Sequence, residues 1–120
     1  MRRALKRLPL IAAVVFVAGL LLPERAIVPV QDAGTQDWNA QSFWYEPWGV
    51  SGVHKGIDIF APEGRAVLAP VSGLVVFRGQ LGIGGNVVVV LGPKWRLHYF
   101  AHLRTSQVGV LSFVSKRQQI

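Results

Sequence analysis

The feature that most constrains the fold is a regular succession of short apolar segments after residue 55, each closed by glycine or proline. Apolar, β-branched runs of this length, separated by turns with glycine and proline, are typical of strands rather than helices. The segment 80–85 carries three glycines and predicts a hairpin between its two neighbours. We therefore predict an all-β domain with strands at 56–60, 66–69, 74–78, 86–91 and 95–103.

The beginning of the chain has a different character. Residues 1–7 carry four basic side chains and no acid, whereas residues 8–22 are uncharged and mostly apolar. A basic start followed by a ~15-residue apolar stretch is the pattern of an export signal. No small-residue cleavage site follows Leu22, so an uncleaved membrane anchor is an alternative, whereas a buried core helix would leave the basic cluster unexplained.

The sequence divides into three predicted parts. We predict an N-terminal apolar signal or anchor helix at 1–22, a linker with an aromatic arm at 23–49, and the domain at 50–120. The expected location is the periplasm or cell envelope, with membrane contact through the N-terminal segment or anchoring in the inner membrane.

Charge and cysteine content exclude several functions. The net charge is +7, but four of the 13 basic residues belong to the N-terminal segment, which leaves +3 against the six acids. The remaining basic residues are scattered singly, so no nucleic-acid partner is predicted. Because the chain has no cysteine, disulfides, thiolate catalysis and cysteine-based metal sites are excluded.

The arm at 42–49 is rich in aromatic residues. It holds Phe43, Trp44, Tyr45 and Trp48, and it is interrupted by Pro47 and Gly49. Stacking on sugar rings is one use of such side chains, but packing over the domain or beside a cleft is the commoner one and is the use we predict.

His54 and Asp58 are candidate metal ligands because histidine and aspartate bind first-row metals, and one further histidine would complete an open zinc site. In a straight strand two residues four apart lie about 13 Å from each other, too far to share one ion. A helix is disfavoured by Gly56 and by the β-branched and proline residues that follow. We therefore place His54 on a loop, with Gly56 bending the chain and Asp58 opening a strand.

Two further histidines lie in the last long segment. In a regular strand His98, Phe100 and His102 point to one face, with the two histidines about 13 Å apart. At most one of them can therefore belong to a site with His54 and Asp58.

The stretch from His54 to Pro62 resembles the H-x-G-x-D segment of the lysostaphin/LytM-like zinc metallopeptidases, which cut peptide bridges in bacterial peptidoglycan. The resemblance continues in order through 69–76, 84–90 and 99–103, and an ordered series of motifs is more specific than any one. It implies a small antiparallel β-sandwich of the duplicated-hybrid-motif type, with peptidoglycan peptide bridges as the substrate. It also implies zinc bound by His54 and Asp58 and a catalytic role for His102, while His98 falls outside the motif and is taken as structural.

The chain also departs from that family. The family completes its site with a downstream H-x-H motif that supplies the third ligand and helps to activate water, whereas no histidine follows His102 here. Residues 114–120 resemble the strand just before that motif, so the sequence is expected to be C-terminally truncated, with weak zinc binding and impaired hydrolysis. The alternative is a non-catalytic module of the same type that binds cell wall or regulates a partner hydrolase. A biotin-carrier-like barrel would need a lysine at a hairpin tip, which we do not identify.

Overall fold

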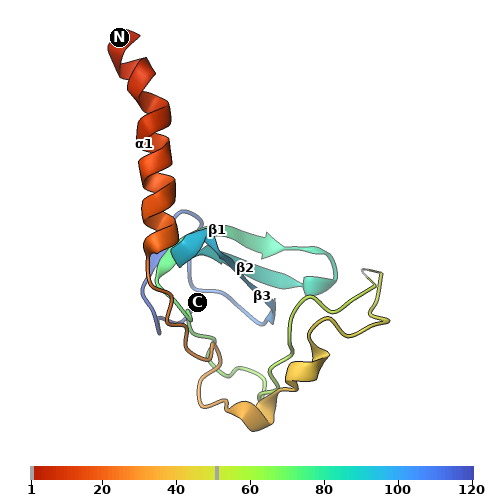
Figure 1. Cartoon of the computed structure of the whole chain (residues 1–120). Helices are drawn as coiled ribbons and strands as arrows, with labels where there is room; N and C mark the ends of the chain where they lie inside the picture. Colours follow the sequence, from red (N-terminus) through yellow and green to blue (C-terminus); the bar gives the residue numbers. More distant parts are fainter. Residues whose placement is uncertain (1, 51) are drawn as a thin grey trace.

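The computed structural model describes residues 2–50 and 52–120. One long helix, α1 (Arg2–Leu21), precedes a single antiparallel sheet of four strands in the order β3-β2-β1-β4. The helix projects away from the sheet, and the linker and aromatic arm run along the opposite side of the domain (Figure 1). The strands are β1 (Gly73–Gln80), β2 (Asn86–Leu91), β3 (Leu97–Leu103) and β4 (Phe113–Val114); the short 3-10 helices are η1 (Thr35–Asp37), η2 (Ala40–Ser42), η3 (Gly82–Gly84) and η4 (Pro93–Trp95).

Valines of β1, β2 and β4 form much of the core. Val75, Val88, Val90 and Val114 are fully buried, and they cluster with residues from outside the sheet such as Ile120. Burying one such side chain contributes on the order of 1.5–3 kcal/mol, so this cluster supplies most of the apolar stabilisation of the domain. The core therefore follows from the apolar runs that predicted the strands.

The predicted hairpin is confirmed, since β1 and β2 pair antiparallel across the glycine-rich turn that contains η3. Neighbouring Val87 and Val88 are both buried although their side chains point to opposite faces, so β2 is covered on both sides there. An irregularity on β1 between Val75 and Phe77 leaves Val76 without a partner in register.

The all-β expectation is correct only in part. Among the described residues the strands form one sheet rather than the two packed layers of a sandwich, and a 20-residue helix accompanies it. Segment 56–60 forms no strand, because within residues 2–50 and 52–120 it has no partner strand and its one backbone hydrogen bond runs from the Phe60 N–H to the Asp37 carbonyl. Segment 66–69 forms only the isolated bridges Val30–Val67 and Leu68–Gln119. Its backbone hydrogen bonds go to the linker on one side and to residues 117–120 on the other, and neither contact extends into a regular ladder.

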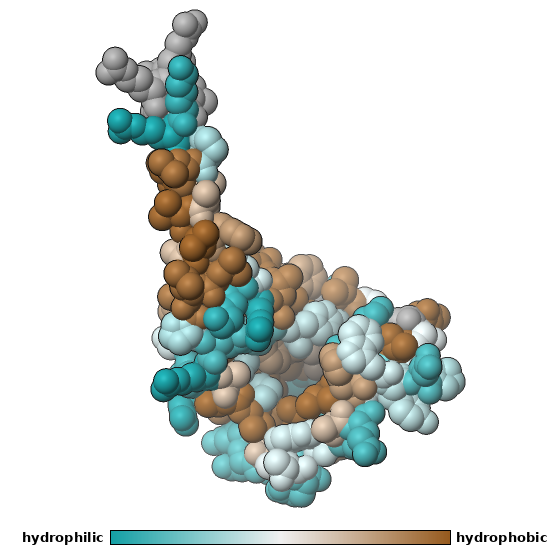
Figure 2. Space-filling view, in the orientation of Figure 1, coloured by the Kyte–Doolittle hydropathy of each residue, from teal (hydrophilic) through white to brown (hydrophobic). Residues whose placement is uncertain are grey.

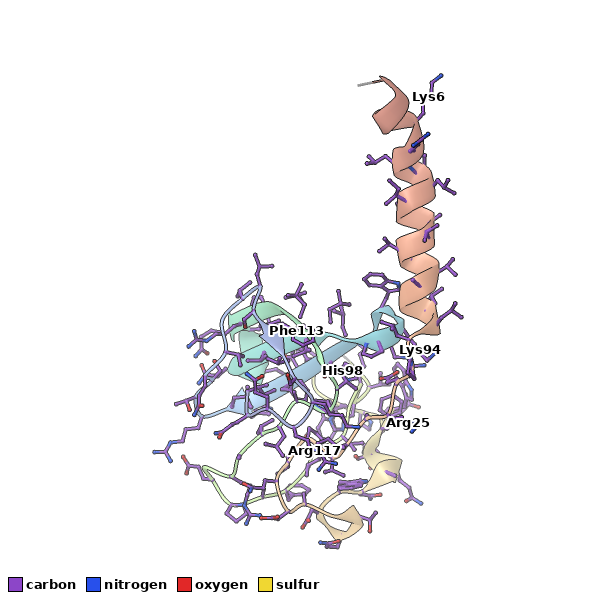
Figure 3. All side chains as sticks on the ribbon, turned by 90° about the vertical axis from the view of Figure 1, so that its left-hand side faces the viewer. Lys6, Arg25, Lys94, His98, Phe113 and Arg117 are labelled. Atoms are coloured by element: carbon purple, nitrogen blue, oxygen red, sulfur yellow. The ribbon has the colours of Figure 1, made fainter. Side chains whose placement is uncertain are left out.

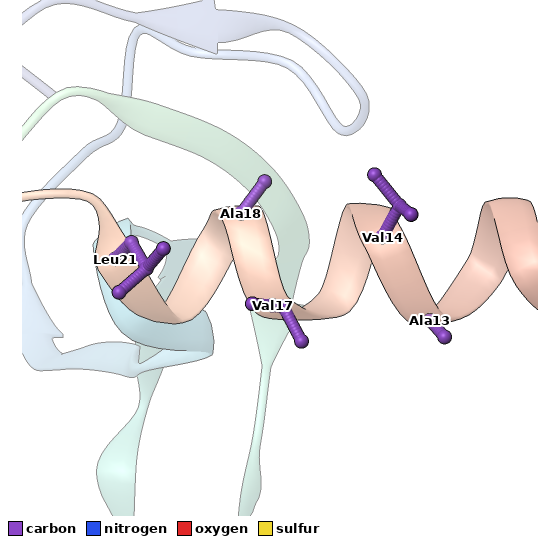
Figure 4. A pocket seen from close by; sticks show the side chains of 5 residues that line it. All are labelled: Ala13, Val14, Val17, Ala18 and Leu21. Atoms are coloured by element: carbon purple, nitrogen blue, oxygen red, sulfur yellow. The ribbon is translucent and has the colours of Figure 1, made fainter.

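Helix α1 is mostly exposed and apolar, as the brown surface of the projecting helix shows (Figure 2). A shallow hollow on it is lined by Ala13, Val14, Val17, Ala18 and Leu21 alone, and these side chains offer no polar group to a ligand (Figure 4). Within residues 2–50 and 52–120, no helix combines the length and apolarity needed to cross a membrane. The predicted anchor and membrane contact therefore find no support among the described residues.

The C-terminal half of α1 rests on η4, the turn between β2 and β3. The Trp95 indole stacks on Phe16 with ring centroids 6.5 Å apart, and its Nε1 donates to the Phe16 carbonyl at 2.8 Å. Gly19 is buried under the same indole, which a Cβ at this position would overlap. Lys94, at the foot of the helix in Figure 3, donates from Nζ to the Leu20 carbonyl, as suits a cation at a helix C-terminus.

Candidate metal centre

His54 lies on a loop, as predicted, and two backbone hydrogen bonds hold it against the aromatic arm. Its N–H donates to the Tyr45 carbonyl at 2.9 Å, and its carbonyl accepts from the Trp44 N–H at 2.6 Å. Asp58 does not open a strand, since residues 56–62 have no regular secondary structure. Gly56 does not adopt a positive φ, and a Cβ there would meet open space, so the bend does not require a glycine.

His54 and Asp58 face each other. His54 Nε2 lies 3.6 Å from Asp58 Oδ1, far closer than the ~13 Å of an extended strand. Two ligands about 2.0–2.1 Å from one tetrahedral zinc are separated by ~3.3 Å, so a small movement of either side chain would allow a shared ion. The loop has thus brought together the predicted pair with a geometry that fits zinc.

The two side chains differ in their surroundings. The His54 side chain is only 12% exposed, whereas that of Asp58 is 50% exposed. The histidine is therefore held within the protein, and the carboxylate leaves the pair open to solvent on its own side. A metal held here would have one protein-covered side and one accessible side, as open zinc sites do.

The orientation of the His54 ring is set by two contacts. Nδ1 lies 3.1 Å from the Ser42 carbonyl, which can only accept, so the neutral ring carries its proton on Nδ1 and its lone pair on Nε2. The indole of Trp48 stacks on the imidazole with ring centroids 4.1 Å apart and an interplanar angle of 14°. The lone pair that can bind a metal is therefore the one on the nitrogen that faces Asp58.

His102 lies on β3 but is not brought to the pair. In residues 2–50 and 52–120, no three histidine or acidic side chains gather closely enough to hold a metal. The register between β2 and β3 shifts between Asn86 and Val88, which pair with Leu103 and Phe100, so β3 carries an extra residue there. His102 has φ 57° within this bulge and is exposed.

The bulge also corrects the predicted alternation along β3. Phe100 packs against the core and Leu103 belongs to it, although a regular strand would place these two side chains on opposite faces. The extra residue restores Leu103 to the core face and turns His102 out, away from the face shared by His98 and Phe100. A bulge cannot be predicted from alternation alone, since alternation assumes a regular strand.

His98 takes part in a separate polar cluster. Its Nε2 lies 3.4 Å from Glu24 Oε1, and Arg96 Nη1 donates to Glu24 Oε2 at 2.7 Å. The His98 Nε2 contact lacks hydrogen-bond alignment, and no other partner is present for this buried atom among the described residues. This arrangement ties the linker to β3 and is consistent with a structural histidine.

The contributions of Ser42 and Trp48 were not predicted. A backbone carbonyl carries no sequence signal, and Trp48 was assigned with its aromatic neighbours to general packing. The one available sign was the position of the aromatic arm just before His54.

The chain thus combines an antiparallel sheet with a loop-borne histidine–aspartate pair. Residues 52–120 match the family described as Peptidase family M23, and the chain therefore belongs to this family. It is 33% identical over 76 residues to an L-Ala--D-Glu endopeptidase of Bacillus subtilis (strain 168); the match covers 62% of this chain but only 23% of that protein.

The fold has a counterpart among solved structures. A crystal structure from Pseudomonas aeruginosa, described as an M23 peptidase, superposes with a TM-score of 0.63 at 24% identity. The superposition covers all of this chain and 50% of the other. At this identity the likeness concerns the fold alone.

Proposed function

We propose that this chain carries a zinc metalloendopeptidase-type site that acts on the peptide cross-links of bacterial peptidoglycan. The observation that carries the proposal is the His54–Asp58 pair, whose facing atoms lie 3.6 Å apart within the segment that matches the family. The name of the Bacillus subtilis relative, an L-Ala--D-Glu endopeptidase, supports a substrate of the same chemical kind.

The chain's own residues would divide the work. His54 Nε2 and Asp58 Oδ1 would hold the ion, and Ser42 keeps the His54 proton on the far nitrogen. Zinc bound there would polarise the scissile carbonyl and make a nucleophile from water near neutral pH. By resemblance His102 is the active-site histidine of the Y-x-x-H-L segment, and it would have to be brought to the pair before it could donate a hydrogen bond to the developing oxyanion. Because peptidoglycan lies outside the cytoplasm, the proposal includes a location in the periplasm or cell envelope.

A second function is favoured by one observation. No third histidine or carboxylate joins the pair in the described part of the chain, whereas catalytic zinc sites use three protein ligands and an open position. A non-catalytic module that binds cell wall or regulates a partner hydrolase needs no complete zinc site.

Two measurements on the 120-residue chain separate these functions. One is zinc binding by titration, and the other is the release of new amino groups from purified peptidoglycan, each with His54→Ala as the matched variant. Zinc binding that needs His54, with any hydrolysis lost on chelation, supports the peptidase-type site. Tight binding to peptidoglycan that is unchanged in His54→Ala and independent of zinc would support the module instead.

A further inference from the structure

The aromatic arm forms a small hairpin with the loop that carries His54. Backbone bonds join Trp44 and Tyr45 to His54, and the Trp48 N–H donates to the Gly52 carbonyl at 2.8 Å. The turn depends on glycine, since Gly52 has φ 81°. The two sides of the hairpin thus carry Trp48 and His54 to positions where their rings meet.

The rings of the arm are not used to build the core. The four aromatic side chains at 43–48 are between 38% and 57% exposed, and Trp48 is the least exposed of them. Phe43 and Trp44 contact each other edge to face with ring centroids 5.1 Å apart, whereas Trp48 stacks on His54. The predicted packing over the domain or beside a cleft stays a prediction for the arm as a whole, and Trp48 stands apart because it packs against a candidate metal ligand.

The two contacts on the imidazole act in perpendicular directions. The Ser42 carbonyl lies at the ring's edge and fixes which way Nδ1 points. The Trp48 indole lies against the ring's face, 14° from parallel, and blocks rotation about the Cβ–Cγ bond. A centroid separation of 4.1 Å is shorter than the 4.5–7 Å of most aromatic pairs, so little free rotation is left.

We propose that residues 42–48 are the orienting shell of the metal pair and that Trp48 is a positioning residue for His54. The arm precedes residue 52, where the family match begins, so this role lies outside the segment that the family defines. The proposal rests on the metal-binding function proposed above, because an oriented Nε2 matters for catalysis only if it binds an ion. Partners that orient a metal-binding histidine commonly change metal affinity 10–100-fold when they are removed.

The test compares three variants of the full 120-residue chain. Trp48→Leu keeps apolar bulk without a ring, Trp48→Phe keeps a ring that can stack, and Trp44→Leu is the matched control on the same arm. The His54 tautomer is read from the nitrogen chemical shifts of the imidazole without metal, and zinc affinity is then read by titrating Zn2+ alone against the same signals. Methyl signals of Val75 and Val90 report whether the core is folded.

In Trp48→Leu we expect about a tenfold loss of zinc affinity and a tautomer mixture in place of the Nδ1–H form. Trp48→Phe should recover most of both, and Trp44→Leu should change neither. An unchanged tautomer and a zinc affinity within twofold of the parent in Trp48→Leu would overturn the proposal. If the parent binds no zinc, the proposed function fails, but the tautomer comparison still decides whether Trp48 positions His54. If Trp48→Leu does not fold, Trp48→Phe decides: a retained Nδ1–H form supports the proposal and a mixture overturns it.

Discussion

Replacing Asp58 by alanine tests whether the pair acts as a chelate. With Nε2 and Oδ1 already 3.6 Å apart, closing to the ~3.3 Å that a tetrahedral ion requires costs little rearrangement. Once one ligand has bound, the second binds as an intramolecular group, which raises overall affinity by 10²–10⁴. Because Asp58 is half exposed and must be held in place, we take the lower limit and expect Asp58→Ala to weaken zinc binding about 100-fold.

The assay is a competition titration of Zn2+ against a chromophoric chelator, run on the parent and on Asp58→Ala. Glu63→Gln serves as the control, since it removes an exposed carboxylate of the same loop that forms no part of the pair. If Asp58→Ala binds zinc within threefold of the parent while His54→Ala abolishes binding, the chelate reasoning is refuted. The second ligand would then have to come from another residue, such as His98.

Three further perturbations give separate outcomes. Gly19→Leu should displace the Trp95 indole from α1, which would appear as a shift in tryptophan emission and faster proteolysis of the helix. Val90→Ala should lower the free energy of unfolding by about 1.5–3 kcal/mol in a urea titration, because it opens a cavity in the core, whereas Val110→Ala at an exposed site should change it by under ~0.5 kcal/mol. His102→Ala should leave zinc affinity within twofold, since His102 does not join the pair; a tenfold loss would place it among the ligands.

The parts of the fold that could be predicted are those set by local apolar runs. Segments 74–78 and 86–91 form β1 and β2, and their valines bury in one core cluster. Segment 56–60 looked equally strand-like, yet its alternating apolar residues meet no partner strand. A strand needs a neighbour to accept its hydrogen bonds, and the presence of that neighbour is not a local property of sequence.

The candidate site also has parts that could be predicted from the sequence and parts that could not. The closeness of His54 and Asp58 could be predicted because a shared ion is incompatible with a straight strand and a helix is disfavoured here, which leaves a loop. His102 was expected on the face of His98 and lies elsewhere, because one extra residue in β3 turns the later side chains over. Such a shift depends on how β3 pairs with β2 and on the burial of Leu103 in the core.

The orienting shell shows why the boundaries of a family match and of a functional site need not coincide. A ligand must be a particular residue, so the segment that carries His54 and Asp58 is recognisable by sequence. A stacked ring and a backbone carbonyl can be supplied by many sequences, provided that the chain passes beside the ligand. Here the passage is enforced by three backbone hydrogen bonds between the arm and residues 52–54, one of which involves His54 itself as donor. The residues that orient the metal pair therefore begin ten positions before the matched segment, at Ser42, and a chain cut at residue 50 would retain both ligands without the contacts that aim one of them.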